Sequence, residues 1–245
     1  MNVIPEKTGP ERGRSFLDQQ PQNRPCWSCE YKSDDLYNCS QCDKLQEFLE
    51  ETDYFNWFGF GYFLSIDQDA LEKQYHLLSR KFHPDFHQKT SPEEQAISLE
   101  NTAHLTKAYR ILKDRKKRMA YLIELLVGAQ APPTNVADDL FEEILEIQER
   151  MEAMQEMDRS QNDRKEALLS SLKIDLENME SHRKEIEESL QSLSLKWDCL
   201  EEKRGAGPLG DSQILYLQEI KTLLAKDTYL DRIIQEIRRS IEGGS

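Results

Sequence analysis

The segment Arg80-Lys81-Phe82-His83-Pro84-Asp85-Phe86 decides how the middle of the chain folds. Before it, apolar residues recur at three- and four-residue steps and predict a helix over 68–82, with Asp67 as its N-cap. A residue that precedes proline is pushed out of the α region. The helix is therefore expected to stop before the tripeptide His83-Pro84-Asp85, which would lie on an exposed loop.

Further helices are expected on both sides of this segment. One should begin at Ser91-Pro92, because serine is a preferred N-cap and proline fits the first helical position. Its apolar side is expected to contain Leu99, Leu105, Ala108, Ile111 and Leu112. A basic run at 113–118 leads into a short helix over 119–127. Upstream, 44–51 is expected to form a short connecting helix, and the aromatic cluster at 53–59 another.

The helix over 68–82 should carry a basic face. Lys73, Arg80 and Lys81 lie off its apolar stripe and are therefore expected to face solvent. Residues 67–121 as a whole carry 8 acidic and 11 basic side chains. This part of the chain should therefore prefer an acidic partner surface, although the whole protein has a net charge of −14.

Four cysteines form two Cys-x-x-Cys pairs, Cys26 with Cys29 and Cys39 with Cys42. Each pair can direct two thiolates at one point, and four thiolates complete a tetrahedral structural zinc site. Two disulfides are the alternative, and the lack of a secretory signal argues against them. Iron uses the same ligands and stays open. The segment could serve metal-supported folding, a homodimer through this N-terminal part, or docking elsewhere.

The C-terminal half predicts a separate helical domain. Pro132-Pro133 mark a boundary, and helices are expected over 136–158, 160–204 and 211–242. The glycine-rich turn at 205–210 is long enough to reverse the chain. The apolar steps of these helices therefore predict an antiparallel three-helix bundle with coiled-coil-like packing.

Several functions are not expected. The sequence contains neither a phosphate-binding glycine loop nor a plausible catalytic set, so the chain is predicted not to be an enzyme. Its apolar stretches are too short to span a membrane. Residues 1–25 are predicted to be a disordered lead-in, and their prolines and acidic residues are unlike a transit peptide.

Together these motifs resemble the J-protein family, and within it the HscB type that serves iron–sulfur cluster assembly. Tyr75 and Leu78 precede the tripeptide, and Ala108-Tyr109 follows it, as in J-domains. The opening Asp53-Tyr54-Phe55 is HscB-like, and so is the C-terminal bundle. The four-cysteine segment resembles that of the animal mitochondrial members. The resemblance covers about residues 26–242.

The resemblance implies an all-α protein with a zinc-knuckle segment at 26–50, a J-domain at 53–128 and a three-helix bundle at 135–242. The family's J-domains dock on a DnaK-type heat-shock chaperone and stimulate its ATPase. The residues that would do so here are His83, Pro84, Asp85, Lys73, Arg80 and Lys81. The mitochondrial matrix is the implied compartment, with the cytoplasm as a second one.

The resemblance also implies a surface that holds the iron–sulfur scaffold protein. Its residues would be Phe141, Leu145, Glu146 and Glu149 on the first bundle helix, with Tyr229 on the third as a neighbour. The four-residue spacing of Phe141, Leu145 and Glu149 places them on one stripe. Phe141 and Leu145 could instead belong to the bundle core. A second apolar row, Ile144, Ile147 and Met151, could serve as the core in their place.

Two other functions stay open at this point. One is a J-protein with a different client. The other is a zinc-ribbon nucleic-acid-binding protein that uses the basic run at 113–118, against which the net charge of −14 argues.

Overall fold

A computed structural model describes residues 24–33, 35–49, 52–128, 140–156, 162–204 and 208–243. Most of these residues are helical, and the strands are limited to a short antiparallel ribbon of β1 (Arg24–Pro25) and β2 (Lys32–Ser33), so the all-α prediction is confirmed. Residues 1–23 of the predicted lead-in, the prolines at 132–133 and residues 205–207 of the glycine-rich turn lie outside the described residues. The last two residues of the lead-in, Arg24 and Pro25, form β1 and are ordered, contrary to the prediction.

The chain divides into two compact units. The first contains 1–130 together with 194–215, and the second contains 131–193 together with 216–245. The end of α7 (Asn162–Arg204) and the start of α8 (Asp211–Gly243) therefore belong to the first unit. The domain limits that the resemblance implies stay predictions.

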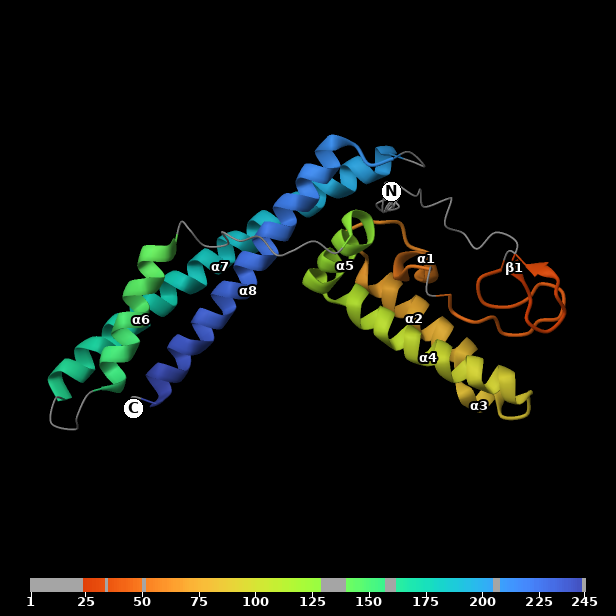
Figure 1. Ribbon diagram of the computed structural model, residues 1–245, viewed down its shortest axis with the longest axis horizontal. Coiled ribbons are helices and arrows are strands. Elements are labelled where there is room, and N and C mark those ends of the chain that lie inside the picture. The colour runs from red at the N-terminus through yellow and green to blue at the C-terminus, as the bar shows by residue number, and fades with distance from the viewer. Residues whose placement is uncertain are drawn as a thin grey trace, which may run out of the picture. The chain divides into compact units, whose positions relative to one another are not determined.

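The first unit is built around an antiparallel pair of helices, α2 and α4, which lie side by side with α3 at one end (Figure 1). Tyr75 of α2 stacks on Tyr109 of α4, with ring centroids 4.2 Å apart. Asp67 and Ser91 cap α2 and α4 as predicted. The helices that lie wholly in this unit are α1 (Tyr54–Phe58), α2 (Gln68–Phe82), α3 (Pro84–His87), α4 (Pro92–Lys113) and α5 (Arg115–Val127).

The predicted connecting helix at 44–51 is wrong, because 44–49 is not helical in the structure. Side chains of α4 bind its backbone groups instead. Glu94 accepts a hydrogen bond from Leu45 N (3.3 Å), and the Asn101 side chain accepts from Phe48 N (2.9 Å) and donates to Gln46 O (2.8 Å). These long-range partners satisfy the groups that a helix would have paired internally.

The basic run at 113–118 also differs from its prediction. Asp114 caps α5, which begins at Arg115 rather than at residue 119. Arg118 is only 3% exposed, and its guanidinium donates to the carbonyls of Leu64 and Leu112. A buried arginine that satisfies main-chain acceptors is part of the core, so the run is not one continuous exposed face.

On α4, Leu99 is 65% exposed rather than buried as predicted, and Ile97 is buried instead. Ile97, Asn101, Leu105, Ala108 and Leu112 follow steps of four and three and lie on the buried side. Leu99 falls between these steps, so the helical period turns it outward.

The end of α7 packs into the first unit. The fully buried Trp197 donates from its indole N–H to Tyr62 O at 2.7 Å. Asp198 accepts from the backbone N–H groups of Leu64 and Ser65 at 2.6 and 2.9 Å. These contacts fix the segment between α1 and α2, and they were not predicted from the sequence.

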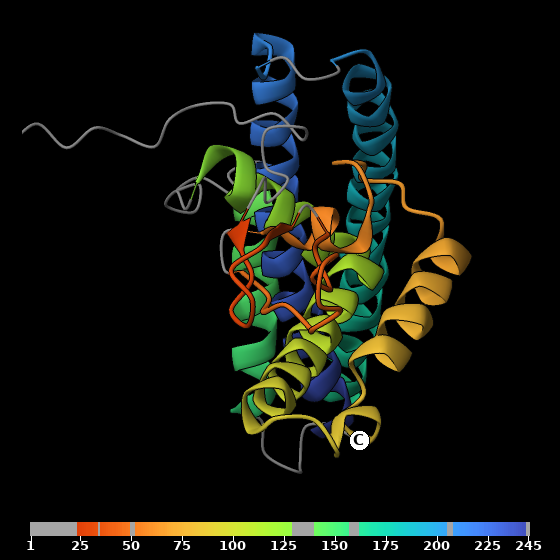
Figure 2. The ribbon, with the colours of Figure 1, turned by 90° about the vertical axis from the view of Figure 1, so that its right-hand side faces the viewer.

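The second unit contains α6 (Phe141–Gln155) with most of α7 and α8, and the three helices run alongside one another (Figures 1 and 2). Arg150 of α6 pairs with Asp175 of α7 at 2.8 Å. Arg183 and Asp227 interrupt the apolar steps of α7 and α8, and they form an ion pair with each other at 3.1 Å. The two polar interruptions therefore compensate one another inside the bundle. No helix in the described part of the chain has the length and apolar character needed to cross a membrane.

Candidate functional site

The tripeptide is a helix junction rather than the loop that we predicted. Helix α2 ends at Phe82, and His83 has an extended backbone (φ −61°, ψ 126°). Pro84 then occupies the first turn of α3. The imidazole Nδ1 of His83 accepts a hydrogen bond from Asp85 N at 3.2 Å and so caps this turn. The proline ends one helix and starts the next, because its ring fixes φ at a helical value.

Side chains of α4 hold the last turn of α2 in place. Phe82 is the last residue of α2, and its carbonyl oxygen accepts hydrogen bonds from Ser98 Oγ (2.7 Å) and Thr102 Oγ1 (3.0 Å). His87 of α3 donates from Nε2 to Lys81 O at 3.0 Å. Such terminal carbonyls need partners from outside the helix. The backbone on both sides of the tripeptide is therefore fixed.

The functional groups of the tripeptide face outward. The side chains of His83 and Asp85 are 48% and 72% exposed. Because Nδ1 of His83 accepts a backbone hydrogen bond, the neutral imidazole carries its proton on Nε2. The junction thus presents an N–H donor and a carboxylate acceptor to solvent.

Of the three cations on α2 that were predicted to face solvent, two are exposed and one is half-buried. Lys73 and Arg80 are exposed. Lys81 is half-buried, and its Nζ lies 5.1 Å from the centroid of the Tyr37 ring. The aromatic ring favours the cation through its electron-rich face.

Two exposed apolar side chains of this surface were missed in the sequence. Leu77 is 56% exposed and lies one helical turn from both Lys73 and Lys81. Phe86 is 67% exposed, and its ring centroid lies 6.0 Å from that of His83. The four-residue spacing of Leu77 from the two lysines was the signal that could have identified it.

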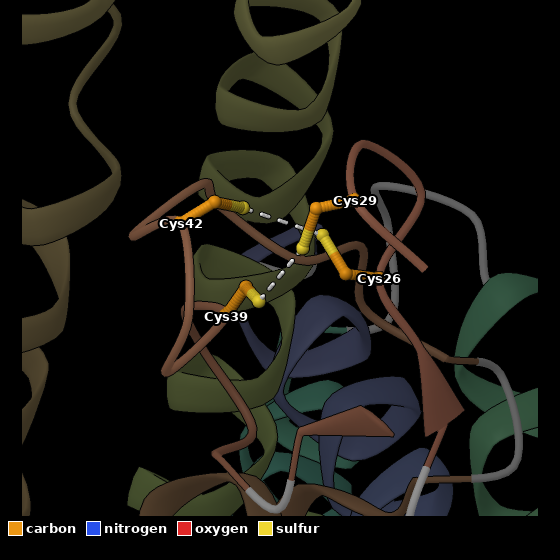
Figure 3. Close-up of side chains that lie close together, drawn as sticks. All are labelled: Cys26, Cys29, Cys39 and Cys42. Carbon is orange, nitrogen blue, oxygen red and sulfur yellow. Dashed lines mark hydrogen bonds between the residues drawn. The ribbon is translucent and has the colours of Figure 1, made fainter. Parts of the chain in front are cut away.

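The four cysteines converge as predicted (Figure 3). Their Sγ atoms all lie within 4.8 Å of one another, and the distances Cys26–Cys42 and Cys29–Cys39 are both 3.6 Å. A disulfide would require about 2.05 Å. A zinc ion with Zn–S bonds of about 2.3 Å would hold its thiolates roughly 3.8 Å apart. The geometry therefore fits a four-thiolate metal site and contradicts the disulfide alternative.

The electrostatics of this cluster favour a cation at its centre. Burial disfavours the Cys26 thiolate, but N–H donors of Ser28, Cys29 and Gln46 outweigh it and lower the pKa of Cys26 to about 6. Although the Lys44 N–H favours the Cys42 thiolate, burial and the neighbouring sulfurs raise the pKa of Cys42 to about 12. Four crowded thiolates repel one another, so a divalent cation is needed to keep all of them ionised.

On α6 the structure distinguishes the two apolar rows. Ile144, Ile147 and Met151 are buried, whereas Phe141 and Leu145 are 64% and 45% exposed. Glu146 and Glu149 are exposed as well. The second row is therefore the bundle core, and an apolar and acidic row faces solvent.

Tyr229 of α8 was predicted to be a neighbour of this row, and its ring centroid lies 5.0 Å from the Arg232 guanidinium on the same helix. Its place beside Phe141 stays a prediction.

Comparison with known proteins identifies the class to which the first unit belongs. A family model described as "DnaJ domain" matches residues 64–121, which contain α2, the tripeptide, α4 and part of α5. The helix pair, the fixed tripeptide and this match define a J-domain protein.

The similarity extends beyond the J-domain. "Iron-sulfur cluster co-chaperone protein HscB homolog" of Arabidopsis thaliana is 33% identical over 148 residues, 60% of this chain and 57% of that protein. "Co-chaperone protein HscB homolog" of Cupriavidus taiwanensis is 31% identical over 123 residues, 49% of this chain and 69% of that protein. The chain belongs to the HscB family of co-chaperones. Its match spans little more than half the length of the Arabidopsis relative.

The fold agrees with this assignment. The crystal structure of human co-chaperone protein HscB superposes with a TM-score of 0.56 at 23% identity. The superposition covers 87% of this chain and 96% of the human one. At this identity the likeness concerns the fold alone.

Proposed function

We propose that this chain stimulates the ATPase of a DnaK-type chaperone and delivers an iron–sulfur cluster scaffold protein to it, without catalysing a reaction itself. The observation that carries the proposal is one chain with two outward-facing surfaces. One is the fixed His83-Pro84-Asp85 junction with its basic flank, and the other is the apolar and acidic row on α6.

The chaperone-docking face comprises the tripeptide, the three cations and the two apolar side chains, namely Lys73, Leu77, Arg80, Lys81, His83, Pro84, Asp85 and Phe86. The cations would steer an acidic surface of the chaperone toward the junction. His83 and Asp85 would then exchange hydrogen bonds with it. Leu77 and Phe86 would bury apolar area against the chaperone. Salt does not screen this contribution to binding, whereas it screens that of the cations.

The scaffold-binding surface would be Phe141, Leu145, Glu146 and Glu149, with Tyr229 as an added contact from α8. Two exposed apolar side chains one turn apart offer a partner an anchor, and the glutamates at the edge supply charge. This surface needs no core residue to move, because Ile144 and Ile147 already fill the bundle interior.

The metal is proposed to be Zn²⁺, held by Cys26, Cys29, Cys39 and Cys42. Its chemistry there is structural, because all four positions are thiolates and none is left for substrate. The resemblance to animal mitochondrial members favours the mitochondrial matrix as compartment, with the cytoplasm as the second candidate.

The nucleic-acid-binding alternative is not proposed. In the basic run at 113–118 that it would use, Arg118 is buried and donates to Leu64 O, so its charge is not available to a nucleic acid. Lys117 pairs with Asp114 at 3.4 Å, which further reduces the free positive charge.

Replacing Phe141 and Leu145 together by alanine is expected to weaken scaffold binding by about tenfold or more, because each buried apolar side chain is worth roughly 1.5–3 kcal/mol in an interface. Both are exposed in the free protein, so the thermal unfolding midpoint should stay unchanged. Isothermal titration with a purified scaffold protein measures the affinity. The matched control is Ile174→Ala with Leu195→Ala, which removes two equally exposed apolar side chains of α7. Equal affinities of the two double variants would contradict this surface.

A further inference from the structure

We propose that Tyr37, which lies between the two cysteine pairs, is a positioning residue of the chaperone-docking face. Through its ring, the metal-loaded cysteine segment would set the placement of Lys81 and of the end of α2. The inference rests on the proposed stimulation of a DnaK-type chaperone and adds a regulator to that surface, namely the metal content of the four cysteines.

The Tyr37 side chain extends from the cysteine segment to the last turn of α2, directly before the tripeptide. Its ring meets that of Phe82 edge-on, with centroids 5.9 Å apart and planes at 62°. The same ring lies 5.1 Å from Lys81 Nζ. Its hydroxyl donates to Trp57 O at 2.6 Å, which anchors the far end of the ring. One side chain thus contacts the two residues that directly precede His83.

The backbone of Tyr37 is held by the fold of the cysteine segment. Asp35 Oδ1 accepts from Tyr37 N at 2.7 Å and from Asn38 N at 3.1 Å. Gln46 N donates to Tyr37 O at 2.8 Å, next to the bridge between Asn38 and Leu45. This bridge encloses the second cysteine pair, so the turn that carries Tyr37 is continuous with the metal ligands.

The ligands are coupled to this turn at two further points. Cys39 N donates to Lys44 O at 2.9 Å within the bridged loop. The Gln46 side chain donates to Cys26 Sγ at 3.5 Å and to Lys44 O at 2.8 Å. A segment this small cannot bury an adequate core, so the metal supplies its folding free energy. Without metal, the turn would lose what fixes Tyr37 against α2.

A second set of contacts fastens the segment to α4. Lys44 Nζ pairs with the buried Glu94 at 2.6 Å, and Asn101 binds Gln46 and Phe48. The segment therefore packs against both helices that support the tripeptide. This arrangement explains why a metal-binding segment could affect a surface that contains none of its ligands.

The effect should appear in affinity rather than in maximal stimulation. Tyr37 does not belong to the tripeptide, and it acts through the placement of Lys81, a cation that steers and holds the partner. Losing this cation–π contact is expected to raise the half-saturating concentration about threefold. A general loss of structure would lower the maximum as well.

The test uses four full-length chains: wild type, Tyr37→Ala, the metal-free variant Cys39→Ser with Cys42→Ser, and the combination of all three substitutions. Zinc per chain is measured for each, and chaperone ATPase is measured against co-chaperone concentration. We expect Tyr37→Ala to keep its zinc and its maximal stimulation and to raise the half-saturating concentration about threefold. The metal-free variant should show a similar rise, and the combined variant should show no further one.

Tyr31→Ala is the matched control, because Tyr31 lies in the same segment and is 47% exposed. It should behave as wild type. Tyr37→Leu keeps the apolar bulk but removes the aromatic face, and it replaces Tyr37→Ala if the latter loses helix content. Wild-type affinity in the Tyr37 variant would overturn the inference. So would a combined variant in which the two effects multiply, because metal would then act by a route other than Tyr37.

A second readout does not depend on the chaperone. The backbone amide signals of Lys81 and His83 are expected to shift in both the Tyr37 variant and the metal-free variant, and to stay in place in Tyr31→Ala. Unmoved signals would overturn the positioning role. If wild type fails to stimulate the chaperone while these signals shift, the proposed function fails and the positioning role of Tyr37 stands.

Discussion

With His83→Gln, the ATPase rate of a DnaK-type chaperone is expected to stay at its basal value, without stimulation. The imidazole is exposed, and its Nε2–H is the donor that the junction presents. A glutamine amide in its place cannot cap Asp85 N and present a donor at the same position. The lost cap costs the short α3 about 1 kcal/mol, and no core contact is removed. The loss should therefore be one of activity with the fold intact.

Single-turnover ATP hydrolysis measures this effect, and circular dichroism measures the helix content. His182→Gln is the matched control, because His182 lies on α7 in the second unit, where it faces Glu143 at 3.5 Å. This variant should stimulate as wild type does. A folded His83→Gln variant with undiminished stimulation would contradict the assignment of the junction.

Metal removal is expected to unfold residues 24–49 and to leave the helices in place. The segment buries little apolar area of its own, and structural zinc contributes on the order of 10–16 kcal/mol to such folds. Trp27 is expected to report the change, because its indole donates to Leu45 O at 2.7 Å and unfolding of the segment would break this hydrogen bond. Its fluorescence should shift to the red on titration with a zinc chelator, and helical circular dichroism should change little.

Cys199→Ser is the control for this measurement, because Cys199 is exposed and belongs to neither pair. It should leave zinc content and the Trp27 signal unchanged, whereas Cys39→Ser should lose both. Acidification should release the metal as well, because protons compete for the thiolates. A chain that keeps its Trp27 signal after complete metal loss would contradict a metal-supported fold.

The end of α2 and the starts of α2 and α4 were predictable because their causes are local. Pro84 ends α2 whatever surrounds it, and Asp67 and Ser91 cap the first turns that follow them in sequence. The cysteine cluster was predictable for the same reason, since two residues between paired thiols already determine a knuckle.

The predictions that were wrong concern residues whose structure depends on contacts distant in sequence. The helix expected at 44–51 does not form over 44–49, because Glu94 and Asn101, about 50 residues away in sequence, bind the backbone N–H groups there. Arg118 looked like surface charge, and it is buried because the carbonyls of Leu64 and Leu112 face it. The contact of Tyr37 with Lys81 depends on how two segments pack, and no periodicity in the sequence encodes that packing.

The helical bundle contains one feature that the sequence predicted as an alternative and one that depends on a contact between helices. The exposed position of Phe141 and Leu145 was one of two alternatives, and the burial of Ile144 and Ile147 decides between them. Arg183 and Asp227 each interrupt an apolar stripe of their own helix. Their pairing across α7 and α8 makes them one feature.

The central claim is that one chain joins a chaperone to its cargo, and ATPase stimulation with and without a scaffold protein tests it most directly. With wild type, the scaffold and this chain together should stimulate the chaperone several-fold more than the sum of their separate effects. Phe141→Ala with Leu145→Ala should keep the stimulation by the chain alone and lose the added effect of the scaffold. Stimulation that is indifferent to the scaffold in wild type would contradict the delivery function.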